Sequence, residues 1–287
     1  MLAGAFALLA ACSLPGSSRV STKVALVIGN AGYESAPALV NPMNDANDMC
    51  AALGRLGFRT LCHRNVRDRA EFETLVKAYA ELLGPDTVGV FFYSGHGVQA
   101  GSANFLIPTQ AQTPSAKDDP LRGLYGVDDL FDRLRGKPTR FQLVILDACR
   151  TELLGPAPPG GPGGPGGRGA VAQPGLLKSL QVVARASDGL APIKDATPGM
   201  LVLYATASKD SASDGDGRNG PLTKHVLAHI ATRGLPVEEF LKRVTAGVQT
   251  ETARAYGRRQ TPYVYGSFSG RFCFAGCPGD AEVPPMQ

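Results

Sequence analysis

The chain has 287 residues, of which 44% are hydrophobic and 19% are charged, and its net charge is +4 at pH 7. This balance is typical of a globular protein and excludes a membrane bundle or a disordered tail. Lysine and arginine form no block, so a nucleic acid is not an expected partner. Glycine and proline, 35 and 22 residues, together reach about a fifth of the chain, against about 12% in average usage.

The amino terminus is apolar. Residues 2–11 read LAGAFALLAA and contain no polar side chain. A membrane-spanning helix needs about twenty such residues, whereas about ten suit the apolar part of a secretion signal. The stretch LAAC, which ends at Cys12, resembles a bacterial lipobox. We therefore expect a signal peptide at 1–11, a lipid on Cys12, a linker at 12–22 and a bacterial cell-envelope or periplasmic location. The lipid is then the one expected membrane contact, and the alternative is an apolar start without function.

Strands and helices are predicted to alternate along the chain. Short apolar runs rich in β-branched residues predict buried strands at 23–29, 58–62, 87–93, 141–146 and 200–207, with a last strand or hairpin at 263–274. Apolar residues at helical spacing predict helices at 44–56, 67–83, 127–134, 222–232 and 237–250. This alternation is typical of an α/β fold with helices on both sides of a mainly parallel sheet.

The excess of glycine and proline lies in one segment. Residues 155–169 contain 13 glycines or prolines in 15 positions, a composition that forms neither helix nor strand. The elements after it are too few for a sheet of their own, so the two halves are expected to complete one sheet. The predicted domain runs over 23–274, with a large portion at 23–150, a loop at 151–198 and a small portion at 199–274. A tail follows at 275–287.

A histidine and a cysteine follow two of the predicted strands directly. The strand TVGVFFY leads into Ser94-Gly95-His96-Gly97, and FQLVIL leads into Asp147-Ala148-Cys149-Arg150. Ligands bind beyond the carboxyl ends of parallel strands, so we expect His96 and Cys149, on polar loops, to project into one crevice. An imidazole can accept the thiol proton, and the N–H groups of Gly97 and Cys149 could form an oxyanion hole. The alternatives are a small buried cysteine and a solvated histidine.

The segments YSGHG at 93–97 and LDACR at 146–150 resemble the histidine and cysteine motifs of caspase-like cysteine peptidases (peptidase C14), in particular the bacterial metacaspase-like branch. Further matches to this family are VIGN at 27–30, NDA at 44–46, ATAS at 205–208 and DGDGRNG at 214–220. The resemblance implies a three-layer α/β/α caspase-like fold with a mostly parallel six-stranded sheet. It also implies that His96 and Cys149 form a catalytic dyad that cleaves peptide or protein substrates through a thioester. A caspase-like module that binds without cutting is the rival hypothesis.

Two carboxylates are expected near the same crevice. Asp147 lies two residues before Cys149, and Asp45 follows the first strand. A pair of carboxylates favours a cationic side chain, and arginine can be held by two hydrogen bonds at once. The acids at these motif positions form the pocket for basic residues in metacaspases, so cleavage after arginine or lysine is expected. Two alternatives stay open: Asp45 caps its helix with Asn44, and Asp147 only binds loop backbone.

The predicted chemistry requires no cofactor and no resident metal. The segment from Asp214 has His225 where a calcium loop of the EF type needs a glutamate. Asp128 and Asp129 match only part of a metacaspase calcium motif, so calcium dependence is left open. His225 and His229 share a helix face without a third ligand for zinc.

Four cysteines have no role in this chemistry: Cys50, Cys62, Cys273 and Cys277. In an exported protein they could pair locally, Cys273 and Cys277 being nearest in sequence, but spacing does not fix connectivity. Basic residues in the loop region are candidate self-cleavage sites, namely Arg168, Lys178 and Arg185. The oligomeric state is not predicted.

Overall fold

The computed structural model describes residues 22–100, 103–112, 119, 121–152, 198–206 and 217–279, with the backbone course alone at 149–152. The predicted signal peptide, Cys12, almost all of the linker, most of the loop at 151–198 and the candidate self-cleavage sites lie outside these residues. Among the helices that are described, none is both long and apolar enough to cross a bilayer.

A central sheet contains six strands in the order β2-β1-β3-β6-β7-β8. Their bounds are β1 (Thr22–Gly29), β2 (Arg59–Arg64), β3 (Thr87–Ala100), β6 (Phe141–Glu152), β7 (Met200–Tyr204) and β8 (Tyr263–Ser267). All neighbours are parallel except β7 and β8. Two short strands that the sequence does not predict, β4 (Ala103–Leu106) and β5 (Tyr125–Gly126), extend the end of β3. The predicted mostly parallel sheet is confirmed, but with β4 and β5 it has eight strands where six were expected.

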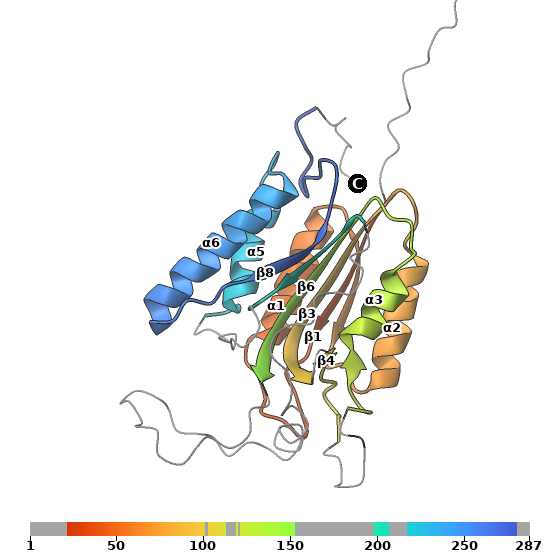
Figure 1. Cartoon of the computed structure of the whole chain (residues 1–287), viewed down its shortest axis with the longest axis vertical. Helices are drawn as coiled ribbons and strands as arrows, with labels where there is room; N and C mark the ends of the chain where they lie inside the picture. Colours follow the sequence, from red (N-terminus) through yellow and green to blue (C-terminus); the bar gives the residue numbers. More distant parts are fainter. Residues whose placement is uncertain are drawn as a thin grey trace, which may run out of the picture.

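Helices cover both faces of the sheet (Figure 1). One layer holds α1 (Pro42–Arg55), α5 (Pro221–Ile230) and α6 (Val237–Tyr256), and the other holds α2 (Arg69–Glu81) and α3 (Val127–Leu134). Successive strand residues serve opposite cores because side chains alternate along a strand. In β3, Phe92 packs toward α1, α5 and α6, whereas Phe91 and Tyr93 pack toward α2 and α3. The fold is the expected three-layer α/β/α arrangement.

The two central strands are longer than predicted. We expected β3 to end at Tyr93 and β6 at Leu146, with polar loops beyond them. Instead the two strands stay paired as far as Gln99 and Glu152. The polar, glycine-rich residues look like a loop in the sequence, but their backbone groups continue the ladder. The expectation that His96 and Cys149 lie on loops is therefore wrong, because both belong to strand extensions.

Helix α1 packs directly on the end of β1. A Cβ atom on Gly29 would lie 2.3 Å from the carbonyl oxygen of Pro42, so this close approach requires glycine. A disulfide between Cys50 and Cys62 joins α1 to β2, and a second joins Cys273 to Cys277. Both pairs link cysteines that are near in sequence. These contacts fix the start of α1 beside the carboxyl end of β1.

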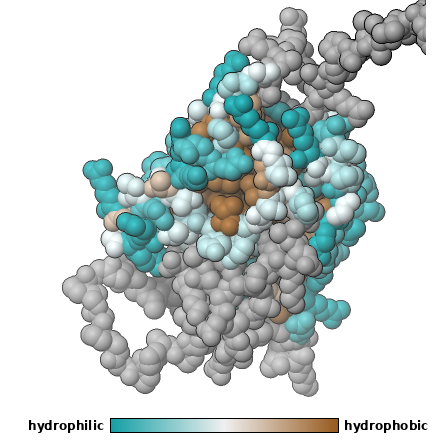
Figure 2. Space-filling view, turned by 45° about the horizontal axis from the view of Figure 1, so that its top comes forward, coloured by the Kyte–Doolittle hydropathy of each residue, from teal (hydrophilic) through white to brown (hydrophobic). Residues whose placement is uncertain are grey.

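Aromatic residues gather at the end of the sheet where β6 begins. Phe141, the first residue of β6, contacts the rings of Phe268, Phe272 and Phe274. Figure 2 brings this end forward and shows apolar residues in the middle of the surface, with hydrophilic residues around them. The strands β3 and β6 run away from this aromatic end. Their carboxyl ends, which carry the predicted site, therefore lie at the other end of the sheet (Figure 1).

Candidate active site

The pairing of β3 with β6 brings the predicted reactive residues together. His96 is the register partner of Cys149, and Ser94 is the register partner of Asp147. Neighbouring strands lie about 4.8 Å apart, so the backbones at positions 96 and 149 are adjacent. Gly97 follows at the next step, between Arg150 on β6 and Leu106 on β4. The sheet thus gathers the residues of both motifs at one place, although the role of each stays a prediction.

His96 is half-buried and is held at its ring and its backbone. Its Nε2 atom lies 2.7 Å from the carbonyl oxygen of Pro37. A carbonyl only accepts, so Nε2 carries the proton and donates it, and in the neutral ring Nδ1 is the acceptor. The ring of Tyr33 lies against the imidazole with 4.5 Å between centroids. The segment 30–41, which carries Tyr33 and Pro37, therefore sets the orientation and the tautomer of His96.

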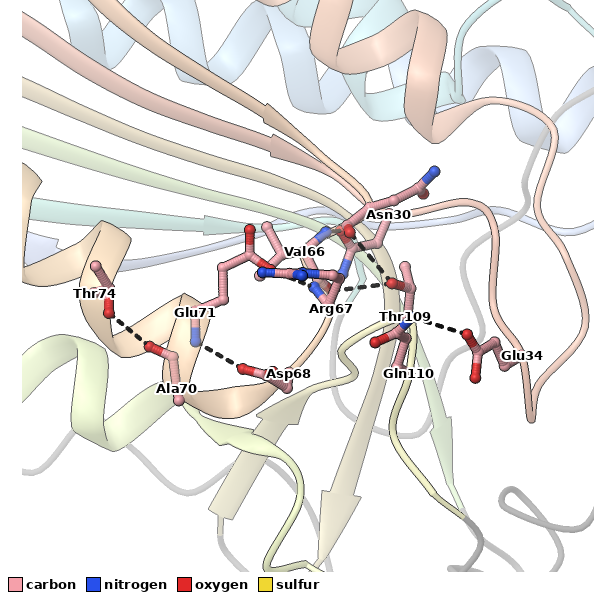
Figure 3. Close-up of polar contacts among 11 residues, drawn as sticks. Asn30, Glu34, Val66, Arg67, Asp68, Ala70, Glu71, Thr74, Thr109 and Gln110 are labelled. Atoms are coloured by element: carbon pink, nitrogen blue, oxygen red, sulfur yellow. Dashed lines mark hydrogen bonds and ion pairs between the residues drawn. The ribbon is translucent and has the colours of Figure 1, made fainter.

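The segment 30–41 is held in place by hydrogen bonds to other parts of the chain. The buried Asn30 donates from Nδ2 to Ile107 O at 3.1 Å and accepts at Oδ1 from the Val66 N–H at 2.9 Å. Farther along, the Glu34 N–H donates to the Thr109 carbonyl at 2.9 Å. Figure 3 shows Asn30, Val66 and Thr109, which come from three separate parts of the chain, close together. The position of Pro37 against His96 therefore depends on the end of β1, on the residues after β2 and on the residues after β4.

Asp45 lies on α1, next to the histidine strand β3. Its side chain is buried, with 1% of the residue exposed. Oδ2 accepts from the Ser94 hydroxyl at 2.9 Å, and Oδ1 accepts from Asn219 Nδ2 and from the Gly220 N–H, both at 3.1 Å. Each donor comes from a different element than α1. The contacts orient the carboxylate without any cationic partner among them.

Asp147, on β6, lies near the Asp45 carboxylate. Its Oδ2 accepts from the hydroxyl of Thr223 at 2.6 Å and from the Thr223 N–H at 3.2 Å. A Cβ atom on Gly220 would lie 3.3 Å from Asp147 Oδ2 and 3.5 Å from Asp45 Oδ2. Both carboxylates therefore border the one glycine, and a larger residue there would enter the space between them.

The electrostatics of this pair favour a cation. Burial, and then the charge of Asp147, raise the pKa of Asp45 to about 7, while the hydrogen bonds from Asn219, Ser94 and Gly220 act in the opposite direction. A buried carboxylate beside another carboxylate is stabilised when an opposite charge approaches. The pair of carboxylates is therefore chemically suited to a guanidinium or ammonium group.

The structure contradicts both alternatives for these acids. Asp45 is not a helix cap, because α1 begins three residues earlier at Pro42, with Asn41 as its N-cap and no side-chain capping bond. The capping alternative is wrong. Asp147 does bind backbone, through the N–H of Thr223 at the start of α5. The alternative that Asp147 only binds loop backbone is wrong, because Thr223 belongs to α5 and its hydroxyl is the closer donor.

Several residues of the site were not predicted as site residues. Ser94 stands inside the YSGHG motif, yet its bond to Asp45 requires α1 to lie over β3. Asn219 and Thr223 are 174 and 76 residues from their carboxylate partners. The DGDGRNG motif contains Asn219, so a signal was present without an indication of its partner. Pro37 has no sequence signal at all.

Metal ligands do not gather in the part of the chain that the structure describes. No group of three or more His, Cys, Asp or Glu side chains there could hold an ion. Asp129, from the partial calcium motif, accepts from Arg69 at 3.1 Å, and His225 pairs with Glu251 at 2.8 Å.

A three-layer α/β/α sheet with histidine and cysteine motifs paired on its central strands defines a caspase-like protein. The chain matches the caspase domain family, peptidase C14, over residues 22–273, and it belongs to that family of cysteine peptidases. It is similar to the human mucosa-associated lymphoid tissue lymphoma translocation protein 1, with 29% identity over 130 residues, which are 45% of this chain and 15% of the human protein. The mouse homolog is 28% identical over 137 residues, 47% of this chain and 16% of that protein. The chain therefore matches only a small part of these relatives. The family predicted from the motifs is confirmed.

Proposed function

We propose that the protein is a cysteine-type endopeptidase in which His96 and Cys149 form the catalytic dyad. The observation that carries this proposal is the register of β3 and β6, which sets Cys149 directly across from His96. The contact of Nε2 with Pro37 O supports it, because it leaves Nδ1 as the ring nitrogen that can accept a proton.

The reaction then follows in two halves. Nδ1 of His96 accepts the Cys149 thiol proton, and the thiolate attacks the peptide carbonyl carbon. The C–N bond breaks, His96 gives its proton to the leaving amine, and a thioester remains. Water attacks the thioester with His96 again as base, which releases the carboxylic acid product and restores the thiol. The N–H groups of Gly97 and Cys149 are the proposed donors to the oxyanion, a role that requires them to leave the β3–β6 ladder when substrate binds.

We further propose that Asp45 and Asp147 select arginine or lysine on the amino side of the cleaved bond. The burial of Asp45 and the mutual repulsion of the two acids support this, since a bound cation relieves the repulsion. Ser94, Asn219 and Thr223 hold the carboxylates in place through the hydrogen bonds described above. Arginine fits such a pair better than lysine because its planar group can contact both acids.

Hydrolysis of fluorogenic peptides that end in arginine, lysine, citrulline or aspartate before the dye tests both proposals. Wild type should cleave the arginine and lysine peptides, and Cys149→Ala and His96→Ala should not. His63→Ala, which removes a histidine on β2 away from the site, should keep full activity. No turnover of any peptide, in the presence of calcium and reducing agent, would instead favour a caspase-like binding module.

Export and a lipid anchor on Cys12 are also proposed. The two disulfides support this, because such bonds persist in oxidising compartments. Labelling with a fatty acid in cells should mark wild type and not Cys12→Ser, and the variant should leave the membrane fraction. The dyad chemistry needs no cofactor, and titration of activity with calcium and a chelator decides calcium dependence.

A further inference from the structure

Two tyrosine hydroxyls meet beside the backbone of His96. The His96 N–H donates to Tyr33 Oη at 2.7 Å, and Tyr93 Oη donates to the His96 carbonyl at 2.8 Å. The two hydroxyl oxygens are 3.3 Å apart. Each hydroxyl has one proton, so the assignment that satisfies all three contacts makes Tyr33 the donor to Tyr93. The hydrogen bonds then form a closed ring that starts and ends on His96, which we call the tyrosine clamp.

The glycine before the histidine fits this arrangement. A Cβ atom on Gly95 would lie 2.6 Å from the hydroxyl oxygens of both Tyr33 and Tyr93. No real Cβ atom comes that close, so any other residue at this position would open the tyrosine clamp. Gly95 is thus explained by the space that the two hydroxyls occupy.

Tyr33 has a second contact with the same histidine. Its ring lies against the imidazole, and its segment carries Pro37, whose carbonyl accepts from Nε2. One segment therefore holds His96 by its N–H, by its ring face and by its ring nitrogen. Tyr93 is fully buried and contacts Phe72, so one side of the tyrosine clamp is anchored in the core.

From these contacts we infer that Tyr33 is a positioning residue: through the tyrosine clamp it fixes the His96 backbone and ring so that Nδ1 remains the proton acceptor. The inference depends on the proposed function for the role of His96 as base, but the geometry that it predicts does not depend on turnover.

Tyr33→Phe removes the hydroxyl and keeps the ring. The His96 N–H then loses its acceptor and Tyr93 loses its donor, so kcat for an arginine peptide should fall about tenfold with KM within about twofold. In protein that also carries Cys149→Ala, imidazole ¹⁵N spectra should show more of the Nδ1–H tautomer. Hydrogen exchange of the His96 amide should become about tenfold faster, since a buried bond is lost. Tyr93→Phe should change the His96 tautomer and the His96 amide exchange rate in the same direction.

Tyr79→Phe is the matched control. This tyrosine is also buried, and its hydroxyl lies beside Gly89, six residues before Gly95 on the same strand. It should leave kcat, the His96 tautomer and the His96 exchange rate as in wild type. A purely structural role for Tyr33 would lower stability and leave the tautomer unchanged.

The outcomes separate the two proposals. Wild-type exchange and tautomer in both Tyr33→Phe and Tyr93→Phe would overturn the tyrosine clamp, whatever the activity. A wild type that hydrolyses no peptide, with His96 signals that still respond to Tyr33→Phe and not to Tyr79→Phe, would uphold the clamp and overturn the proposed function. Unchanged kcat in Tyr33→Phe in an active enzyme would overturn the positioning role.

Discussion

Replacing Asp45 with asparagine should lower activity on arginine peptides and raise the stability of the fold. Asparagine has the same size, and its oxygen can still accept from Asn219 and from the Gly220 N–H. The amide nitrogen takes the place of Oδ2, so the Ser94 hydroxyl has to change from donor to acceptor, and the main change is the lost charge. Without this charge the proposed site should bind a cationic side chain less tightly. The fold should become more stable, because a buried carboxylate that Asp147 repels is gone.

The size of the stability gain follows from the pKa of Asp45. Folding raises it from 3.8 to about 7, so the folded state binds a proton more tightly than the unfolded state does. Stability contributed by that proton is present below pH 4 and is lost as the pH rises toward 7. Above pH 7 the ionised carboxylate costs on the order of 4 kcal/mol. Asp147 shares this cost, so we expect Asp45→Asn to gain about 2 kcal/mol at pH 8.5 and almost nothing at pH 4.

The loss of activity can be measured against a neutral analogue. Removing one charged acceptor of a buried guanidinium costs about 2–3 kcal/mol, or about 100-fold in kcat/KM for an arginine peptide. Citrulline has the same shape without the charge, so its kcat/KM should change less than about threefold. In wild type the ratio of the two should also fall below pH 7, as Asp45 takes up its proton.

Asp48→Asn is the control for this experiment. Asp48 lies one turn along α1, and its pKa is lowered by its hydrogen bonds to Arg218, a preference for the charged form opposite to that of Asp45. Asp48 Oδ2 also accepts from Asn219 Nδ2 at 3.0 Å, a bond that the asparagine oxygen can keep. Its replacement should therefore reduce stability above pH 4 and leave the arginine-to-citrulline ratio unchanged. The reasoning is refuted if Asp45→Asn destabilises the protein at pH 8.5, or if it lowers arginine and citrulline turnover equally.

Three further changes test the fold. Removing the Cys50–Cys62 disulfide by a double change to alanine should lower the free energy of unfolding by about 3 kcal/mol, seen in urea titration, with kcat unchanged; an equal midpoint would contradict it. Gly89→Ala should destabilise by about 1–3 kcal/mol, because the new methyl would lie 2.6 Å from the Tyr79 hydroxyl, and an unchanged melting temperature would show that the core has room. Asp68→Ala should cost about 1 kcal/mol in the same titration, since its side chain caps α2 at 2.8 Å from the Glu71 N–H; no loss would mean that the cap contributes nothing.

The architecture was predictable because its signals are local. Strands such as TVGVFFY are apolar on both faces, as a sheet covered by helices on both sides requires. The helix predicted at 67–83 corresponds to α2, and Asp68 caps its start. The polar ends of β3 and β6 were not predictable in the same way. Ser94 to Gly97 have loop composition, and only their pairing with another strand makes them extended.

The sequence predicted the individual residues of the candidate site, but not the partners that orient them. His96, Asp147 and Cys149 come directly after apolar strand sequences, and the topology brings the ends of those strands together. Asp45 lies on the helix that follows the first strand. The partners that orient them come from distant segments, such as Pro37 for the imidazole. Such contacts depend on how loops fold back over the sheet, which no periodicity in the sequence encodes.

A covalent label directed by arginine tests the central claim most directly. A chloromethyl ketone with arginine at its reactive end should add one label to wild type, on the peptide that contains Cys149, much faster than the aspartate analogue does. His96→Ala should slow the labelling, and Cys149→Ala should abolish it. A label on any other residue, or equal rates for the arginine and aspartate reagents, would contradict an acid-lined cysteine peptidase.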